Sequence, residues 1–318
     1  MRLGQNPAKF VNSVAKPERI TVAVLNYIPF ISGYYAELPQ VLETSLRSIR
    51  SSIEGIPYDL MVFDNASCPE VKEQLLRWQD EGLIDMLILS SKNLGKGGAW
   101  NIMLEGAPGE IIAYADNDCL FYPGWLARSL EILETYPNVG MVTARPFRTN
   151  PESYSATLEW ARENEETTVQ EGDLVPFEIF REFDLSLGQS EDEIKTHYQT
   201  SQDVLLSYKG ISAYTGASHW QFTSYKEVLS RYLPFQMDRP MGQVKQLDQR
   251  MNADGYLRLM VTDPLVMNMS NTLENRADVL QKSEPKKIHG GIKEFPPLKK
   301  ALMGLYNRIF KMYYGKDQ

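Results

Sequence analysis

The sequence has little cysteine and no long apolar run. Cys68 and Cys119 are its only two cysteines in 318 residues, and they form no CxxC pair. We therefore expect a reducing, cytoplasmic environment in which both thiols are small packing residues. No apolar run approaches the ~20 residues that a membrane-spanning helix requires. The first twenty residues also lack the apolar core of a signal peptide.

Basic residues are scarce outside the C-terminal end of the chain. The net charge is −8, from 33 Lys and Arg against 41 Asp and Glu. Residues 282–318 hold nine basic and three acidic side chains, so the rest of the chain carries −14. Because phosphate backbones are bound by clustered Lys and Arg, this acidic body argues against nucleic acid as a partner.

The basic segment has the pattern of an amphipathic helix. Within 293–318, five apolar residues stand at helical spacing: Leu298, Leu302, Leu305, Ile309 and Met312. We expect a C-terminal helix whose lysines face the acidic body. The alternative is an interfacial helix on anionic lipid, which would give peripheral contact at the inner membrane face.

The sequence also lacks internal repeats and both common glycine-rich phosphate loops, GxxxxGK[ST] and GxGxxG. Short apolar runs instead alternate with amphipathic stretches. The predicted strands are 20–28, 58–67, 84–91 and 110–118, and the predicted helices are 38–53, 69–82 and 97–107. This rhythm predicts an α/β fold with a Rossmann-like, mostly parallel sheet flanked by helices. Ligands bind beyond the carboxyl ends of the strands in such sheets.

The pattern changes after residue 149. Residues 150–210 hold 14 acidic side chains against four Lys and Arg, with weak apolar periodicity. We expect an acidic helical insertion, with a mobile lid or acceptor-binding element as the alternative. Regular structure returns after 210, ending in a helix closed by Asp254-Gly255 and a strand from about Tyr256 to Val261.

In "AYADNDCLF" (113–121), two aspartates, Asp116 and Asp118, stand one residue apart at the end of an apolar run. If the strand continues, both point to the same face, where their charges repel. A hard divalent cation, Mg²⁺ or Mn²⁺, relieves that repulsion and can neutralise a diphosphate leaving group. The alternative is a plain turn cap, a common role of Asp and Asn.

Four segments in order resemble glycosyltransferase family 2, the inverting nucleotide-sugar transferases with the GT-A fold. They are "ITVAVLNY", "VFDNAS", "NLGKGGAWN" and "GEIIAYADNDCLFYPGWL". The resemblance is good over about 20–130 and weaker over 211–271. It divides the chain into an N-terminal segment (1–19), a donor-binding half (20–149), an insertion with the acceptor-binding half (150–281) and the basic tail (282–318).

The resemblance implies a role for each matching residue. Asp116 and Asp118 would hold Mn²⁺ or Mg²⁺ in a DxD motif. The nucleotide sugar, most simply of UDP type, would contact seven residues: Asn26, Tyr27, Asp64, Asn93, Gly95, Lys96 and Asp116. Trp220 and His219 would lie on the acceptor side, where Trp220 could stack on a sugar ring or simply pack in the core.

An inverting transfer also needs a base for the acceptor hydroxyl. The acidic pair of many relatives falls here on Gln243-Val244, and neither residue can act as a base. Asp248 is the first candidate, and Asp238 and His219 are the others. A metal-binding histidine of some relatives corresponds to Asn268, which leaves the third protein ligand open.

The sequence therefore predicts a metal-dependent inverting glycosyltransferase. Its acceptor would be a glycan, a lipid-linked glycan or a protein. Because the acidic pair is missing, an inactive nucleotide-sugar-binding or scaffold protein remains the alternative. A sugar-phosphate nucleotidyltransferase fits less well, since "NYIPFISGYYAELP" offers one glycine and no basic residue after the first strand.

Overall fold

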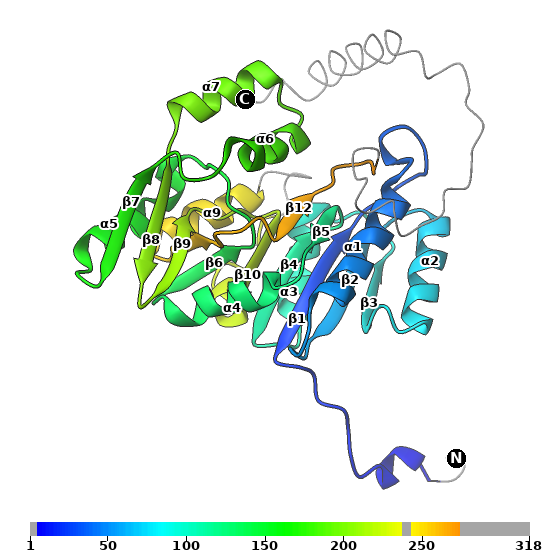
Figure 1. Cartoon of the computed structure of the whole chain (residues 1–318). Helices are drawn as coiled ribbons and strands as arrows, with labels where there is room; N and C mark the ends of the chain where they lie inside the picture. Colours follow the sequence, from blue (N-terminus) through cyan, green and yellow to red (C-terminus); the bar gives the residue numbers. More distant parts are fainter. Residues whose placement is uncertain (1–4, 237–242, 274–318) are drawn as a thin grey trace, which may run out of the picture. The chain divides into compact units, whose positions relative to one another are not determined.

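The computed structural model describes residues 5–236 and 243–273. They form a ten-stranded sheet with helices on both faces, and a small two-stranded sheet beside it (Figure 1). The strand order of the large sheet is β3-β2-β1-β4-β10-β6-β11-β9-β8-β7. The α/β class with a sheet flanked by helices is thus confirmed.

The strands have the following bounds: β1 Ile20–Asn26, β2 Asp59–Asn65, β3 Met86–Ser90, β4 Ile111–Asp116, β5 Cys119–Phe121, β6 Val139–Thr143, β7 Thr167–Gly172, β8 Asp203–Tyr208, β9 Ile211–Thr215, β10 Gln221–Tyr225, β11 Leu257–Met260 and β12 Val266–Asn268. The α-helices have these bounds: α1 Leu38–Ser52, α2 Pro69–Asp80, α3 Gly95–Gly106, α4 Trp125–Thr135, α5 Ser155–Glu163, α6 Phe177–Ser186, α7 Glu191–Thr200, α8 Lys226–Ser230 and α9 Gln243–Ala253.

The first four strands are parallel, as the alternating pattern predicts. Asn26 at the end of β1 is in register with Asp64 on β2, and Leu25 is in register with Asp116 on β4. Parallel strands bring their carboxyl ends to one edge of the sheet. We call this the donor edge, defined by Asn26, Asp64 and Asp116.

Beyond β4 the sheet is mixed. β10 runs antiparallel to both β4 and β6, and β11 is parallel to β6 but antiparallel to β9. The acidic region 150–210 contains α5, α6 and α7, but it also supplies β7 and β8, which extend the sheet. β7 is an exposed, polar edge strand, so it carries no apolar alternation that could predict it.

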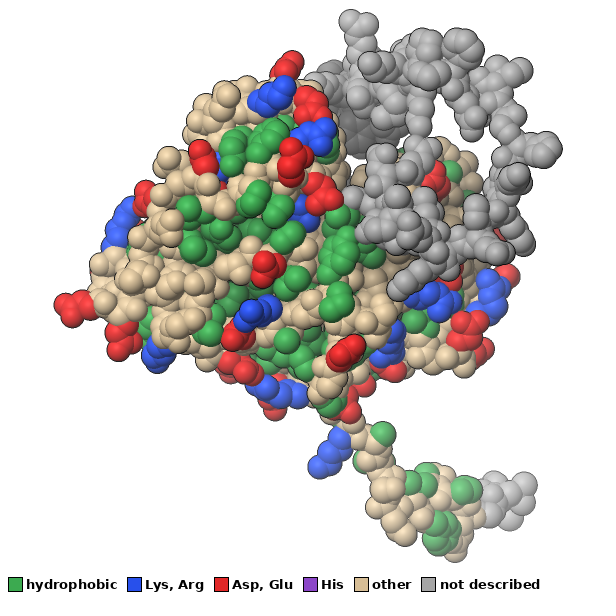
Figure 2. All heavy atoms as spheres, viewed as in Figure 1, with side chains coloured by type: hydrophobic (Ala, Val, Ile, Leu, Met, Phe, Trp, Pro, Cys, Tyr) green, Lys and Arg blue, Asp and Glu red, His purple; other side chains and the backbone are tan. Residues whose placement is uncertain are grey.

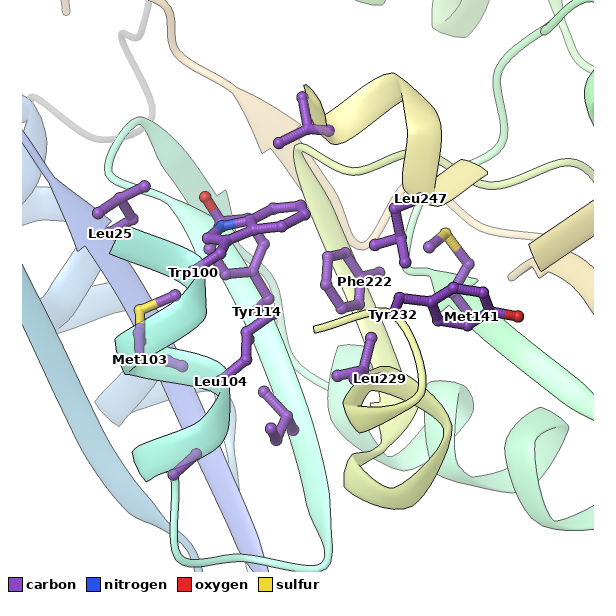
Figure 3. Close-up of a cluster of buried hydrophobic side chains, with 14 of the residues drawn as sticks. Leu25, Trp100, Met103, Leu104, Tyr114, Met141, Phe222, Leu229, Tyr232 and Leu247 are labelled. Carbon is purple, nitrogen blue, oxygen red and sulfur yellow. The ribbon is translucent and has the colours of Figure 1, made fainter. Parts of the chain in front are cut away.

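One face of the sheet is covered by α3, α8 and α9. Their apolar side chains form a buried cluster with those of the strands beneath. Trp100 of α3 packs edge-on against Tyr114 of β4, with ring centroids 4.9 Å apart. Figure 3 shows Phe222 of β10 between these rings and Leu247 of α9. This cluster joins the helix after the glycine loop to the helix that carries Asp248.

The opposite face is covered by α1 and α4. Trp125, the first residue of α4, is fully buried, and its indole N–H donates to Ser52 Oγ of α1 at 3.1 Å. The β5–β12 pair lies against α1, where Ser48 Oγ accepts the N–H of Phe121 at 3.0 Å. This pair follows Asp118 directly and brings residues 266–268 beside it.

The N-terminal segment adds nothing to this core. Residues 5–19 are exposed throughout, including the hydrophobic side chains of Phe10, Val11 and Val14. Figure 2 shows hydrophobic side chains, in green, on the surface of this segment. Within the described residues no helix is long and apolar enough to cross a membrane. The predicted basic helix of 293–318 lies outside the described residues.

Candidate active site

Buried amide and carboxylate groups organise the donor edge. Asn26 and Asp64 are both fully buried, and Asn26 Nδ2 donates to Asp64 Oδ1 at 2.9 Å and to Ser67 Oγ at 3.0 Å. Asp64 Oδ2 accepts the N–H of Ser67 at 3.0 Å. Asn117 Nδ2 completes the network by donating to Asn26 Oδ1 at 2.8 Å. Asp64 therefore has no exposed surface in this structure, and its contact with a nucleotide stays a prediction.

The glycine loop is fastened to the end of β2 by Asn65. Its amide oxygen accepts the N–H of Leu94 at 2.8 Å, and its Nδ2 donates to Asn93 Oδ1 at 3.0 Å. Asn93 Oδ1 also accepts the N–H of Gly95 at 2.8 Å. Gly95 has φ +67°, a conformation that favours glycine, and α3 begins there. The loop thus places the first turn of α3 at the donor edge.

Lys96 binds Asp116 directly. Its Nζ lies 2.7 Å from Asp116 Oδ1 and 2.8 Å from Oδ2, and the Tyr114 hydroxyl also donates to Asp116. The side chains of Lys96 and Asp116 are 15% and 29% exposed, so the pair opens to solvent on one side. Burial, and then the nearby charge of Asp116, raise the pKa of the Tyr114 hydroxyl well above its ordinary value. Tyr114 therefore remains a hydrogen-bond donor at neutral pH.

The negative charge of Asp118 is much less well compensated than that of Asp116. Burial and the charge of Asp116 raise the pKa of Asp118 to about 7, although Lys96 opposes this shift. No side chain of the described residues donates a hydrogen bond to the Asp118 carboxylate, and the residue is half-buried. Its backbone carbonyl is engaged, because it accepts the N–H of Met269 at 2.8 Å. Asp118 is therefore a carboxylate whose charge lacks a partner within the described protein.

This arrangement fits a divalent cation better than a turn cap. A turn-capping carboxylate accepts hydrogen bonds from neighbouring backbone groups, whereas Asp118 has little of this kind. No group of three or more His, Cys, Asp or Glu side chains converges on one point within the described part of the chain. Mg²⁺ and Mn²⁺ do not require such a three-residue cluster, since they commonly take one or two carboxylates and complete their coordination shell with water and phosphate oxygens. Asn268, on β12, accepts the N–H of Ser270 through its side chain at 2.6 Å.

A second polar cluster lies where β10 begins. His219 Nδ1 is 2.8 Å from Asp248 Oδ2, and Arg258 Nη2 is 2.8 Å from Asp248 Oδ1. Arg258 is only 1% exposed, and burial lowers its pKa while Asp248 opposes that effect. The structure therefore brings together two of the three candidate bases, His219 and Asp248. The third, Asp238, lies outside the described residues.

The remaining predicted site residues have different surroundings. Trp220 is 9% exposed and packs against Phe183, with ring centroids 5.4 Å apart. This is the core-packing arrangement, and stacking on a sugar stays a prediction. Tyr27 is half-buried at the end of β1, with its ring edge-on to Tyr35 at 6.3 Å.

Three residues of the donor edge were not predicted from sequence: Asn65, Tyr114 and Asn117. Asn65 follows Asp64 and Asn117 follows Asp116. Their positions beside predicted site residues, within the same motifs, could have indicated that they belong to the site. Tyr114 is two residues before Asp116, on the same side of β4, and strand alternation could have found it.

Comparison with known proteins finds similarity to glycosyltransferases. Residues 30–183 match the family model described as glycosyl transferase family 2. An uncharacterized glycosyltransferase of Nostoc sp. is 26% identical over 124 residues, which cover 39% of this chain and 35% of that protein. The amylovoran biosynthesis glycosyltransferase AmsE of Erwinia amylovora is 29% identical over 110 residues, 34% of this chain and 41% of that protein. The matches thus span well under half of either relative.

Solved structures of glycosyltransferases are also similar. A mannosyltransferase from Pyrobaculum calidifontis, in complex with GDP-Man and Mn²⁺, has a TM-score of 0.45 and 19% identity, covering 79% of this chain and 56% of its own. TarS of S. aureus, residues 1–349, has a TM-score of 0.44 and 13% identity, covering 78% and 59%. The similarity to the family rests on the sequence matches, and the family model covers the glycine loop, Asp116 and Asp118. The match over residues 30–183, just under half of the chain, and the two glycosyltransferase relatives support membership of glycosyl transferase family 2.

Proposed function

We propose that the protein is a metal-dependent inverting glycosyltransferase. It would move a sugar from a nucleotide-diphosphate donor to a hydroxyl of a glycan, a lipid-linked glycan or a protein. The observation that carries this proposal is the geometry of the donor edge, where Lys96 pairs with Asp116 while no side chain of the described residues donates a hydrogen bond to the Asp118 carboxylate. The family match covers these three residues. A divalent cation that binds together with the donor diphosphate would supply positive charge beside Asp118.

The donor side is built to receive an anion next to a cation. Lys96 lies in the first turn of α3, whose N-terminus favours negative charge. Its ammonium group has three N–H donors, and Asp116 occupies only part of them. We propose that Lys96 turns part of this capacity to the donor diphosphate, while Asn65 and Asn93 hold the loop in place.

The carboxylates of Asp116 and Asp118 would hold Mn²⁺ or Mg²⁺. When bound, such an ion neutralises charge that develops on a diphosphate leaving group. The protein's own part is to fix Asp116 through Lys96 and Tyr114 and to leave Asp118 free to bind. Asn26 and Asp64 support this edge from beneath, and a UDP-type nucleotide would lie above them.

Donor hydrolysis tests the proposal without knowledge of the acceptor. The protein is incubated with Mn²⁺ and, separately, UDP-glucose, UDP-N-acetylglucosamine and GDP-mannose, and nucleotide diphosphate release is measured. We expect slow release from at least one donor, and its loss in Asp118→Asn. Tight donor binding with no turnover in water or with added glycans would instead support an inactive binding protein. Pyrophosphate release from a nucleoside triphosphate would support a nucleotidyltransferase.

A further inference from the structure

The base of the proposed reaction can be sought in the cluster of His219, Asp248 and Arg258. Asp248 has both carboxylate oxygens engaged, one by His219 and one by Arg258, each at 2.8 Å. The Arg258 guanidinium also donates to the backbone carbonyls of Ser153 and Ala217. Asp248 thus balances a buried positive charge. A carboxylate in this position is poorly free to take a proton from a substrate, because doing so would leave Arg258 without its counterion.

His219 does not carry that constraint. An ionised carboxylate can only accept hydrogen bonds, so the ring hydrogen of His219 lies on Nδ1, facing Asp248. Nε2 then keeps its lone pair, and no partner for it is found among the described residues. The His219 side chain is 24% exposed, against 13% for Asp248. The atom of this cluster that is open to a substrate is therefore Nε2 of His219.

The loop before β10 connects the backbone of His219 to the donor edge. His219 precedes Trp220, whose carbonyl accepts the N–H of Asp116 at 2.9 Å. Ser218 is fixed by its N–H, which donates to Thr143 Oγ1 at 3.0 Å. Gly216 has φ +105°, and a Cβ there would lie 2.8 Å from Thr149 Oγ1. The loop path is thus closely determined, and it brings His219 within one residue of the backbone bonded to Asp116.

We propose that His219 is the general base of the transfer, with Asp248 as its positioning residue. This inference rests on the proposed glycosyltransferase function. The acceptor hydroxyl, or water in donor hydrolysis, gives its proton to His219 Nε2. The oxygen's electron pair forms the new bond to the anomeric carbon of the sugar. The bond from that carbon to the donor oxygen breaks, and its electrons leave with the nucleotide diphosphate. His219 then returns the proton to solvent.

Within residues 5–236 and 243–273, the charged groups that face His219 are Asp248 from α9 and, behind it, Arg258 from β11. The chain offers a matched pair elsewhere. His197 Nδ1 lies 3.0 Å from Asp184 Oδ2, on helices α7 and α6 of the acidic region. That pair has the same chemistry but no tie to Asp116, so it is the control for any general effect of losing a His–Asp contact.

The experiment compares His219→Asn with His197→Asn. An asparagine at 219 retains an amide that can donate to Asp248, but it removes Nε2. With UDP-glucose, UDP-N-acetylglucosamine or GDP-mannose and Mn²⁺, we expect the turnover number of hydrolysis in His219→Asn to fall by ~10²-fold or more. Donor KM and the melting temperature should change little. His197→Asn should match the wild type.

A second measurement guards against a merely structural effect. In His219→Ala, added imidazole should recover part of the lost turnover, because it replaces the missing base in the space that the side chain leaves. It should not accelerate Asp118→Asn. Two results would overturn the assignment of His219. One is a turnover number in His219→Asn within threefold of the wild-type value, and the other is no recovery of turnover with imidazole in a folded His219→Ala. If the wild type itself releases no nucleotide diphosphate from any of the three donors, the transferase proposal fails instead.

Discussion

The two halves of the sheet treat buried charge in opposite ways. The half beyond β4 buries three arginines, each paired with a carboxylate of the same half: Arg145 with Glu182, Arg148 with Asp203 and Arg258 with Asp248. The donor edge pairs Lys96 with Asp116 and leaves Asp118 without a side-chain donor in the described residues. Each of these buried arginines thus has a carboxylate counterion in the folded chain, whereas Asp118 is not paired with a cationic side chain among the described residues. Substitutions of Lys96 and Asp118 should therefore mainly affect function, whereas breaking a buried arginine pair such as Arg148–Asp203 should mainly affect stability.

The largest effect should come from breaking a pair in the second half. Arg148 donates from Nε and Nη2 to both oxygens of Asp203 at 2.9 Å, and both side chains are almost fully buried. Arg148→Met should lower the free energy of unfolding by about 3–5 kcal/mol, because it leaves a buried carboxylate uncompensated. Urea denaturation measures this. Arg181→Met, which breaks an exposed pair with Glu191 in the same region, is the control and should have a much smaller effect. Equal losses in the two variants would contradict the comparison.

Asp118→Asn should lower donor turnover strongly without lowering the stability of the fold. We expect donor turnover to fall by ~10²–10³-fold, since the cation that neutralises the leaving group loses its ligand. The unfolding free energy of the metal-free protein should be unchanged or higher at pH 8, because a poorly compensated charge is removed. Turnover and urea denaturation are measured on the same preparation. A large loss of stability in this variant would mean that Asp118 is a structural residue.

Lys96→Met should weaken donor binding by about 10–100-fold, the range for losing a hydrogen bond to a charged group. The aliphatic chain keeps its packing, and Trp100 and Tyr114 lie beneath it, with the Lys96 ammonium 5.5 Å from each ring centroid. Calorimetric titration with UDP or GDP in the presence of Mn²⁺ measures the change. An unaltered dissociation constant for both nucleotides would show that Lys96 only neutralises Asp116.

The smallest expected effect is a pH-dependent response to metal. The pKa of Asp118 is raised to about 7, so below pH 7 the folded, metal-free protein favours the protonated form of this residue. The stability gained from that proton is present at low pH and is lost as pH rises through about 7. Mn²⁺ needs the ionised form, so it should raise the melting temperature more at pH 8 than at pH 5.5. Asp118→Asn should abolish this difference. An equal shift at both pH values would contradict a role for Asp118 in binding metal.

Much of the donor edge could be predicted because its signals are local. The strands β1, β2 and β4 read as short apolar runs, and their order dictates that Asn26, Asp64 and Asp116 share one edge. Sequence could not show that Asp64 is fully buried, since that follows from its bonds to Asn26 and Ser67. Nor could it show β7, whose polar residues pair only because β8 lies alongside.

By itself, the sequence determined the α/β order of elements, the glycine loop and the spacing of Asp116 and Asp118, because each depends on residues close in the chain. Only the tertiary structure decided which charges are compensated. His219, Asp248 and Arg258 come from a loop, a helix and a strand, and they meet because α9 packs across β10 on the apolar cluster (Figure 3). A contact between distant segments depends on how whole elements pack, and no local pattern of residues records it.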